Sequence, residues 1–157
     1  MALKRLWAAY KRYKEIVKIV AAIFGVIAGL AACGLFAKKY QNYHASGWAA
    51  FSALCAVYFL HVVFSVRRDL ERKINPDCFS LYMVFSSLGI MTGLVVFVTY
   101  IAMGANHQEG IDPKGSYISA VWGFMSFKWS LFAFLSSSAY RKKYLALDEE
   151  TSVIVNS

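Results

Sequence analysis

Four long apolar runs are the feature that most constrains how this chain folds. They cover residues 16–37, 46–66, 79–104 and 117–140. A helix needs about 20 mostly apolar residues to cross the hydrocarbon core of a bilayer, and each run is long enough. The runs lack the alternation of barrel strands, and in lipid only helices and closed barrels satisfy their backbone groups. We therefore predict an all-α fold, an integral membrane four-helix bundle.

The composition agrees with this interpretation. Hydrophobic residues make up 59% of the chain and charged residues 17%, against about 45–50% and about 25% in soluble domains. The first run has 22 residues, which exceeds the apolar core of about 7–15 residues in a cleaved signal peptide. We therefore expect it to be a retained span.

The basic residues predict the orientation. Twelve lie in the N-terminal arm, the link between the second and third runs, and the segment after the fourth run, whereas three lie in the other two loops. Lysine and arginine concentrate on the cytosolic side of membrane proteins, so we predict that both termini are cytosolic. The net charge of +8 then reports topology, and we expect membrane lipid, not nucleic acid, as its partner.

This topology divides the chain into three parts. We expect a cytosolic, amphipathic basic arm at 1–15, a four-span domain at 16–140, and a cytosolic tail at 141–157. The tail is polar and acidic from Leu145 onward, and we expect it to lack fixed structure.

The spans offer little to an enzyme. None of the four predicted runs contains an Asp or Glu, and the chain shows no Ser/His/Asp set, paired carboxylates or Gly-rich phosphate loop. We therefore predict that the protein is not an enzyme.

Two polar residues inside the spans stand out, because such residues are costly in lipid and often functional. His61 lies about 22 Å along the second span and Lys128 about 16 Å along the fourth, so the two could share a layer of the bundle. Tyr58 and Ser65 are placed on the same helical face as His61. The alternatives are a histidine that bonds a neighbouring helix and a lysine that reaches a carbonyl cluster or the interface.

The neighbours of Lys128 favour a flat, apolar, anionic ligand. Phe127 and Trp129 flank it, and Trp122, Phe124 and Met125 precede it. Haem has such a face, together with two propionates and an iron that accepts imidazole or phenolate. Only one histidine lies in a span, which argues against a permanently held bis-histidine haem.

A longer motif resembles the haem-responsive-gene family of eukaryotic haem transporters. Its most specific part is Ser-x-Val-Trp-x-Phe-x-Ser-Phe-Lys-Trp, from Ser119 to Trp129, and His61-Val62 in the second span also agrees. The remaining matches are His107-Gln108, Asp112-Pro113 and Ser116-Tyr117.

The resemblance implies sites for haem, which is the transported substrate and not a resident cofactor. The family's second-span ligand corresponds to His61 and its outer-loop histidine to His107, both of which would hold haem iron transiently. Its Phe-Ala-Arg-Lys-Tyr motif corresponds to Ala139–Tyr144, where the leading Phe is missing and one basic residue is added. This departure leaves open whether Tyr140 or Tyr144 contacts haem. We include Tyr58, Trp122, Lys128, Trp129, Arg141, Lys142 and Lys143 in the predicted haem-binding set.

These observations predict a permease that moves haem from the extracellular or endolysosomal side into the cytosol by relay between His and Tyr ligands. An aromatic belt followed by a topology signal is the alternative interpretation of the tail motif. The rival function is a tetraspan adaptor or scaffold without a transported substrate. Tyr144 and Leu147 fit a tyrosine-based sorting signal, and we expect a plasma membrane or an endosome/lysosome membrane. A homo-oligomer would fit if the substrate passes between subunits.

Overall fold

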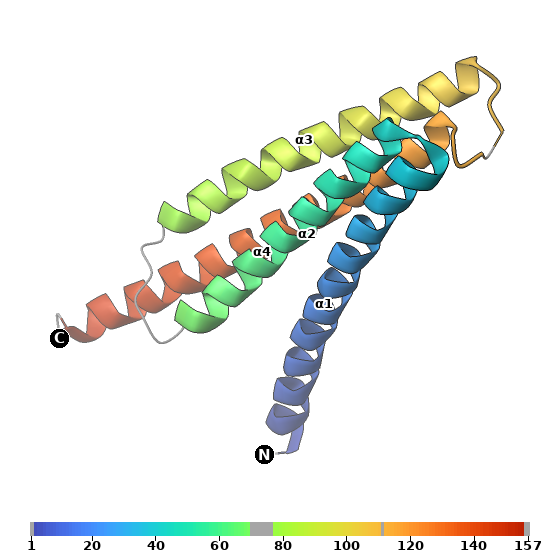
Figure 1. Ribbon diagram of the computed structural model, residues 1–157. Coiled ribbons are helices and arrows are strands. Elements are labelled where there is room, and N and C mark those ends of the chain that lie inside the picture. Colours follow the sequence, from blue (N-terminus) through green and yellow to red (C-terminus); the bar gives the residue numbers. More distant parts are fainter. Residues whose placement is uncertain (1, 70–76, 111, 156–157) are drawn as a thin grey trace.

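The computed structural model describes the backbone of residues 2–69, 77–110 and 112–155, and the side chains of 13–65, 77–110 and 112–146. Within these ranges the chain is a bundle of long helices, and helices that follow one another in the chain run in opposite directions (Figure 1). Both termini lie at one end, here called the terminal end, and the α1–α2 and α3–α4 connections lie at the other, the loop end. The elements are α1 (Ala2–Leu35), the π-helical η1 (Phe36–Tyr40), α2 (Tyr43–Asp69), α3 (Asp77–Asn106) and α4 (Ser116–Val155).

Among the described residues, four helices are long and apolar enough to cross a membrane, which confirms the predicted all-α membrane bundle. Large apolar side chains point outward along them, and Phe24 is 72% exposed. In a bilayer such a surface contacts lipid, so the chain is a multi-pass membrane protein. The spans are Tyr13–Tyr40, Tyr43–Ser65, Asp77–Asn106 and Ser116–Ala146.

The two ends of the chain continue the helices next to them. The basic arm and the first span form one helix, because α1 runs unbroken from Ala2 to Leu35. The expectation of an unstructured tail is wrong, because α4 continues to Val155. Leu145, Ala146, Leu147 and Glu149 are all good helix formers, and they extend the helix beyond the apolar run.

Small residues set the packing of the helices. Helix α2 packs against α1 and α4, and α3 packs against α4. Gly93 of α3 lies against the backbone of Phe127, and Gly29 of α1 lies against Ala49 and Ala53 of α2. Each belongs to a Gly-x-x-x-Gly pair, which lets membrane helices approach closely.

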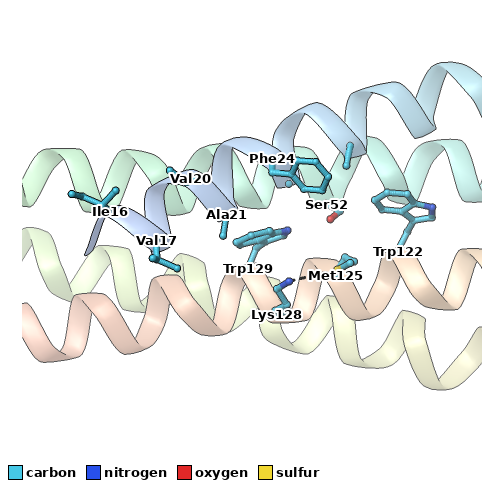
Figure 2. Close-up of a pocket in the computed structure, with 12 residues that line it drawn as sticks. Ile16, Val17, Val20, Ala21, Phe24, Ser52, Trp122, Met125, Lys128 and Trp129 are labelled. Atoms are coloured by element: carbon cyan, nitrogen blue, oxygen red, sulfur yellow. Dashed lines mark hydrogen bonds between the residues drawn. The ribbon is translucent and has the colours of Figure 1, made fainter. Parts of the chain in front are cut away.

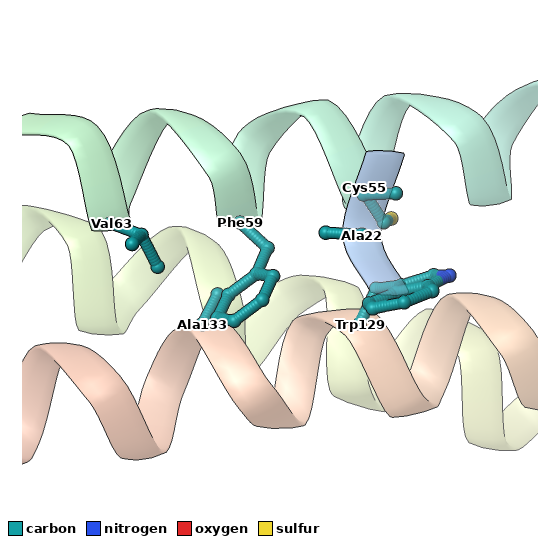
Figure 3. Packing of buried hydrophobic residues seen from close by; sticks show 7 residues of the cluster. Ala22, Cys55, Phe59, Val63, Trp129 and Ala133 are labelled. Carbon is teal, nitrogen blue, oxygen red and sulfur yellow. The ribbon is translucent and has the colours of Figure 1, made fainter. Parts of the chain in front are cut away.

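The buried core lies where α1, α2 and α4 meet (Figure 3). Trp129 of α4 stacks on Phe59 of α2, with ring centroids 6.1 Å apart and planes at 28°. Its indole lies against Gly25 of α1, where a β-carbon would clash with the ring. Gly25 thus makes the space in which Trp129 is placed.

Helix α1 leans away from α4 towards its N-terminus (Figure 1). At the loop end, by contrast, the connections are held by hydrogen bonds. The Asn42 side chain accepts a bond from the Ala45 amide (3.0 Å) and donates one to the Pro113 carbonyl (3.3 Å). Glu109 accepts bonds from the amide and the hydroxyl of Ser116 at the start of α4. The bundle is therefore fixed at its loop end and splayed at its terminal end.

Candidate functional site

A groove of about 570 Å³ lies between α1 and α4, and we call it the Lys128 groove (Figure 2). Helix α4 forms one wall with Trp122, Met125, Lys128 and Trp129, and α2 contributes Ser52. The α1 wall is made only of apolar residues and glycine: Ile16, Val17, Val20, Ala21, Phe24, Gly25 and Ala28. Three members of the predicted haem-binding set, Trp122, Lys128 and Trp129, are therefore brought together.

Lys128 is the charged residue of this groove. Its ammonium lies 4.5 Å from the centre of the Trp129 ring and 4.0 Å from the Met125 sulfur. A ring face attracts a cation but does not neutralise its charge. A cation held in apolar surroundings is a favourable partner for an anion that enters with it.

Ser52 adds a second polar group. Several buried serines of α3 and α4 donate to a carbonyl one turn earlier, as Ser86 does to Tyr82 (2.7 Å) and Ser126 to Trp122 (2.9 Å). The Ser52 hydroxyl differs, because it is buried and has no hydrogen-bond partner among the described residues. An unpaired buried hydroxyl is costly, and a ligand oxygen in the groove would satisfy it.

His61 belongs to a different interface, between α2 and α3. Its Nε2 atom lies 3.2 Å from the Tyr82 hydroxyl and 3.5 Å from the Ser65 hydroxyl, and the imidazole is exposed. Tyr58 donates a hydrogen bond to the Tyr82 carbonyl over 3.0 Å. The predicted grouping of His61 with Tyr58 and Ser65 is therefore present, and α3 adds a phenol that the sequence did not reveal.

The structure does not bring His61 and Lys128 into one site. His61 faces α3, whereas Lys128 faces α1. Depth along a span can be read from sequence, but the direction in which a side chain points depends on which helices are neighbours.

Tyr140 lies in a second cavity between α1 and α4, nearer the terminal end, with a volume of about 730 Å³. Its hydroxyl donates to the Glu15 carboxylate over 3.1 Å, and Glu15 also pairs with Lys18 at 3.1 Å. Lys14 and Lys143 line the same cavity. Tyr140 is thus placed among cations, and Arg141, Lys142 and Lys143 of the tail motif are all exposed.

Tyr144 faces α3 instead. Its ring lies 5.4 Å from that of Phe79, which in turn lies 6.4 Å from Tyr82, the partner of His61. Ring contacts therefore lead from His61 through α3 to the tail. The Leu147 side chain of the predicted sorting signal lies outside the described side chains.

His107 is exposed in the α3–α4 connection, and its amide continues the last turn of α3 by bonding Met103. Sequence reasoning missed Tyr82, Glu15 and Ser52. The contact of Tyr82 with His61 across the bundle has no signal in sequence. Among the described residues no cluster of three or more His, Cys, Asp or Glu could hold a metal ion.

Comparisons with known proteins agree with the resemblance. Residues 80–129 match a family described as haem-transporter, endosomal/lysosomal, haem-responsive gene. The chain is 26% identical to the heme transporter hrg-1 of Caenorhabditis elegans over 144 residues, covering 88% of this chain and 72% of that protein. It is 26% identical to heme transporter hrg-4 of the same organism over 133 residues, covering 83% and 63%.

No solved structure matches the chain. The matched segment contains Tyr82, Trp122, Lys128 and Trp129, whereas His61 lies before it. Both relatives are named as transporters, not as enzymes. The resemblance that the fourth-span motif predicts is therefore confirmed.

Proposed function

We propose that the chain, as a relative of the haem-responsive-gene haem transporters, carries haem across the membrane that its four helices span. The observation that carries the proposal is the Lys128 groove. It combines indole walls, one cation and one unpaired hydroxyl, and its α4 wall lies within the matched residues.

The groove suits the porphyrin and one of its carboxylates. Trp122 and Trp129 offer flat apolar faces, and the Lys128 ammonium offers a charge for a propionate. The Ser52 hydroxyl would donate a second hydrogen bond. A charge-assisted pair of this kind is stronger than a neutral hydrogen bond.

The iron requires other residues. We propose that His107 collects haem at the loop end, that His61 holds the iron within the membrane, and that the tail tyrosines receive it. Imidazole and phenolate are both protein ligands of haem iron. Because the groove and His61 lie at different helix interfaces, we propose that they act at successive steps.

The distribution of charge supports an orientation. The basic segments flank the terminal end, so we propose that this end is cytosolic. In keeping with the family resemblance, we propose that haem moves from the loop end towards it. The host membrane would be the plasma membrane or that of an endosome or lysosome. Tags at the two termini should then resist external protease in intact cells, and cleavage of either tag would refute this orientation.

A titration of the purified full-length protein with ferric haem tests the function. A transporter with a histidine ligand should shift the Soret band of the added haem, and His61→Ala should reduce that shift. If the protein is a tetraspan scaffold, the added haem should show no spectral shift and His61→Ala should have no effect.

A further inference from the structure

A second histidine–tyrosine pair joins α2 to α3 at the loop end. The Nδ1 atom of His44, in the first turn of α2, lies 3.0 Å from the Tyr100 hydroxyl of α3. The two ring centroids are 6.1 Å apart, with planes at 55°. His61 and Tyr82 form the same kind of pair towards the terminal end, also between α2 and α3.

We propose that His44 and Tyr100 form an iron-porphyrin binding site at the loop end, with Lys114 as the partner of a propionate. The inference rests on the proposed function, because it names a further site for the same substrate. It differs from the predicted capture by His107, which lies beyond the end of α3.

The pair is arranged as a ligand and its orienting partner. His44 is exposed, and within the described residues its hydrogen bond to Tyr100 uses Nδ1, which leaves Nε2 for a metal. Histidines that bind metals generally donate from the other ring nitrogen, which fixes the tautomer. When His44 Nδ1–H donates to the phenol oxygen, the Nε2 lone pair is available to iron.

Lys114 lies in the same pocket as His44, although 70 residues separate them. This pocket of about 360 Å³ is lined by Tyr40, Gln41, Asn42, Tyr43, His44 and Lys114. Asn42 is buried and ties its two sides together, because it caps α2 and bonds the carbonyl of Pro113, next to Lys114. The imidazole and the ammonium are thereby held on one surface.

The chemistry of this surface matches the parts of an iron porphyrin. The His44 imidazole can bind the iron, and the exposed Tyr43 ring can pack on the porphyrin face. The Lys114 ammonium can pair with a carboxylate. An exposed site gives up its ligand more readily than a closed one, which suits a position where substrate is first collected. The rival account is that the pair only tethers α2 to α3.

The test uses the full chain in lipid nanodiscs, titrated with ferric haem in a His61→Ala, His107→Ala background. The remaining Soret shift should weaken with His44→Ala, the Kd rising about tenfold, which corresponds to the loss of about 1.4 kcal/mol. Tyr100→Phe keeps the ring and removes the hydroxyl, and it should also weaken binding.

Lys38→Met is the control for Lys114→Met, because Lys38 is exposed in η1 at the same end but does not line the pocket.

Haem dimethyl ester separates the two roles. Lys114→Met should weaken binding of haem but not of the ester, whereas His44→Ala should weaken both. If haem affinity is unchanged by His44→Ala while thermal stability falls, the pair is a tether and the site is refuted. This site alone is refuted if the wild-type protein shifts the Soret band and if His44→Ala does not change the shift that remains in the His61→Ala, His107→Ala background. A wild-type protein without any shift refutes the proposed function as well.

Discussion

The His61 imidazole of α2 lies 3.2 Å from the Tyr82 hydroxyl of α3 and remains exposed. The hydrogen bond can fix the ring orientation while the other ring nitrogen stays available to a ligand. This contact places an intramembrane iron ligand at the α2–α3 interface. It also means that a larger ring at position 61 need not displace a packed helix.

Replacement of His61 should therefore follow ligand chemistry and not size. We expect His61→Tyr to retain appreciable haem uptake, because phenolate also binds haem iron. His61→Ala and His61→Phe should both lose most of it, and Phe is the matched control, with nearly the size of Tyr but no ligand atom. Uptake of a toxic or fluorescent haem analogue, normalised to surface protein, measures this order. If Phe and Tyr perform equally, His61 is not a ligand.

Lys128→Met should weaken binding of haem while leaving the position of the His61-dependent Soret band unchanged. Methionine keeps the bulk of the groove wall but removes the charge that would meet a propionate. The dimethyl ester of haem should bind wild type and Lys128→Met equally. A Lys128→Met protein that binds both porphyrins as wild type does would show that the ammonium has no carboxylate partner.

Ser52→Ala should reduce haem affinity by a smaller factor than Lys128→Met. The hydroxyl contributes one neutral hydrogen bond, worth about 0.5–1.5 kcal/mol, and it has no other partner among the described residues. Ser126→Ala is the control, because the Ser126 hydroxyl is already bonded to the Trp122 carbonyl. Equal affinities for Ser52→Ala and wild type in the haem titration would exclude the hydroxyl from the site.

Single replacements of the two tail tyrosines should have different effects on haem uptake. Tyr140→Phe removes the hydroxyl that bonds Glu15 in the lysine-lined cavity, and we expect it to reduce uptake strongly. Tyr144 packs on Phe79 and does not line that cavity, so we expect a milder effect from Tyr144→Phe. If both variants and the double variant transport normally, the tyrosines serve only as an aromatic belt at the interface.

Gly25 tests the packing on which the groove depends. A β-carbon at Gly25 would crowd Trp129, so Gly25→Ala should lower the free energy of unfolding by about 1–3 kcal/mol. Gly34→Ala, in the same helix, meets nothing within 4 Å and should be neutral or stabilise by up to about 1 kcal/mol. Thermal unfolding of the two proteins in detergent compares them. Equal unfolding temperatures of the two variants would mean that Trp129 can move away from residue 25 without loss of stability.

The sequence predicts the parts of this molecule better than their arrangement. The spans follow from length and apolarity, and the grouping of Tyr58, His61 and Ser65 follows from helical spacing. Such spacing cannot tell which helices are neighbours. It therefore missed that α4 packs against α2 and α3, that Lys128 is turned towards α1, and that Tyr82 reaches His61.

The tail shows the same limit. The four-residue spacing of Tyr140 and Tyr144 indicates that they lie near one helical face. In the bundle, however, one meets Glu15 of α1 and the other Phe79 of α3. Side chains of α4 reach both of those helices, so a small difference in direction changes the partner.

Haem flux into proteoliposomes tests the central claim most directly. Vesicles would contain the purified full-length protein and a trapped apo-haemoprotein whose absorbance reports arriving haem. We predict that wild-type vesicles load haem faster than protein-free vesicles and faster than vesicles with an equal amount of His61→Ala. Loading of wild-type vesicles at the protein-free rate would contradict the assignment of haem transport.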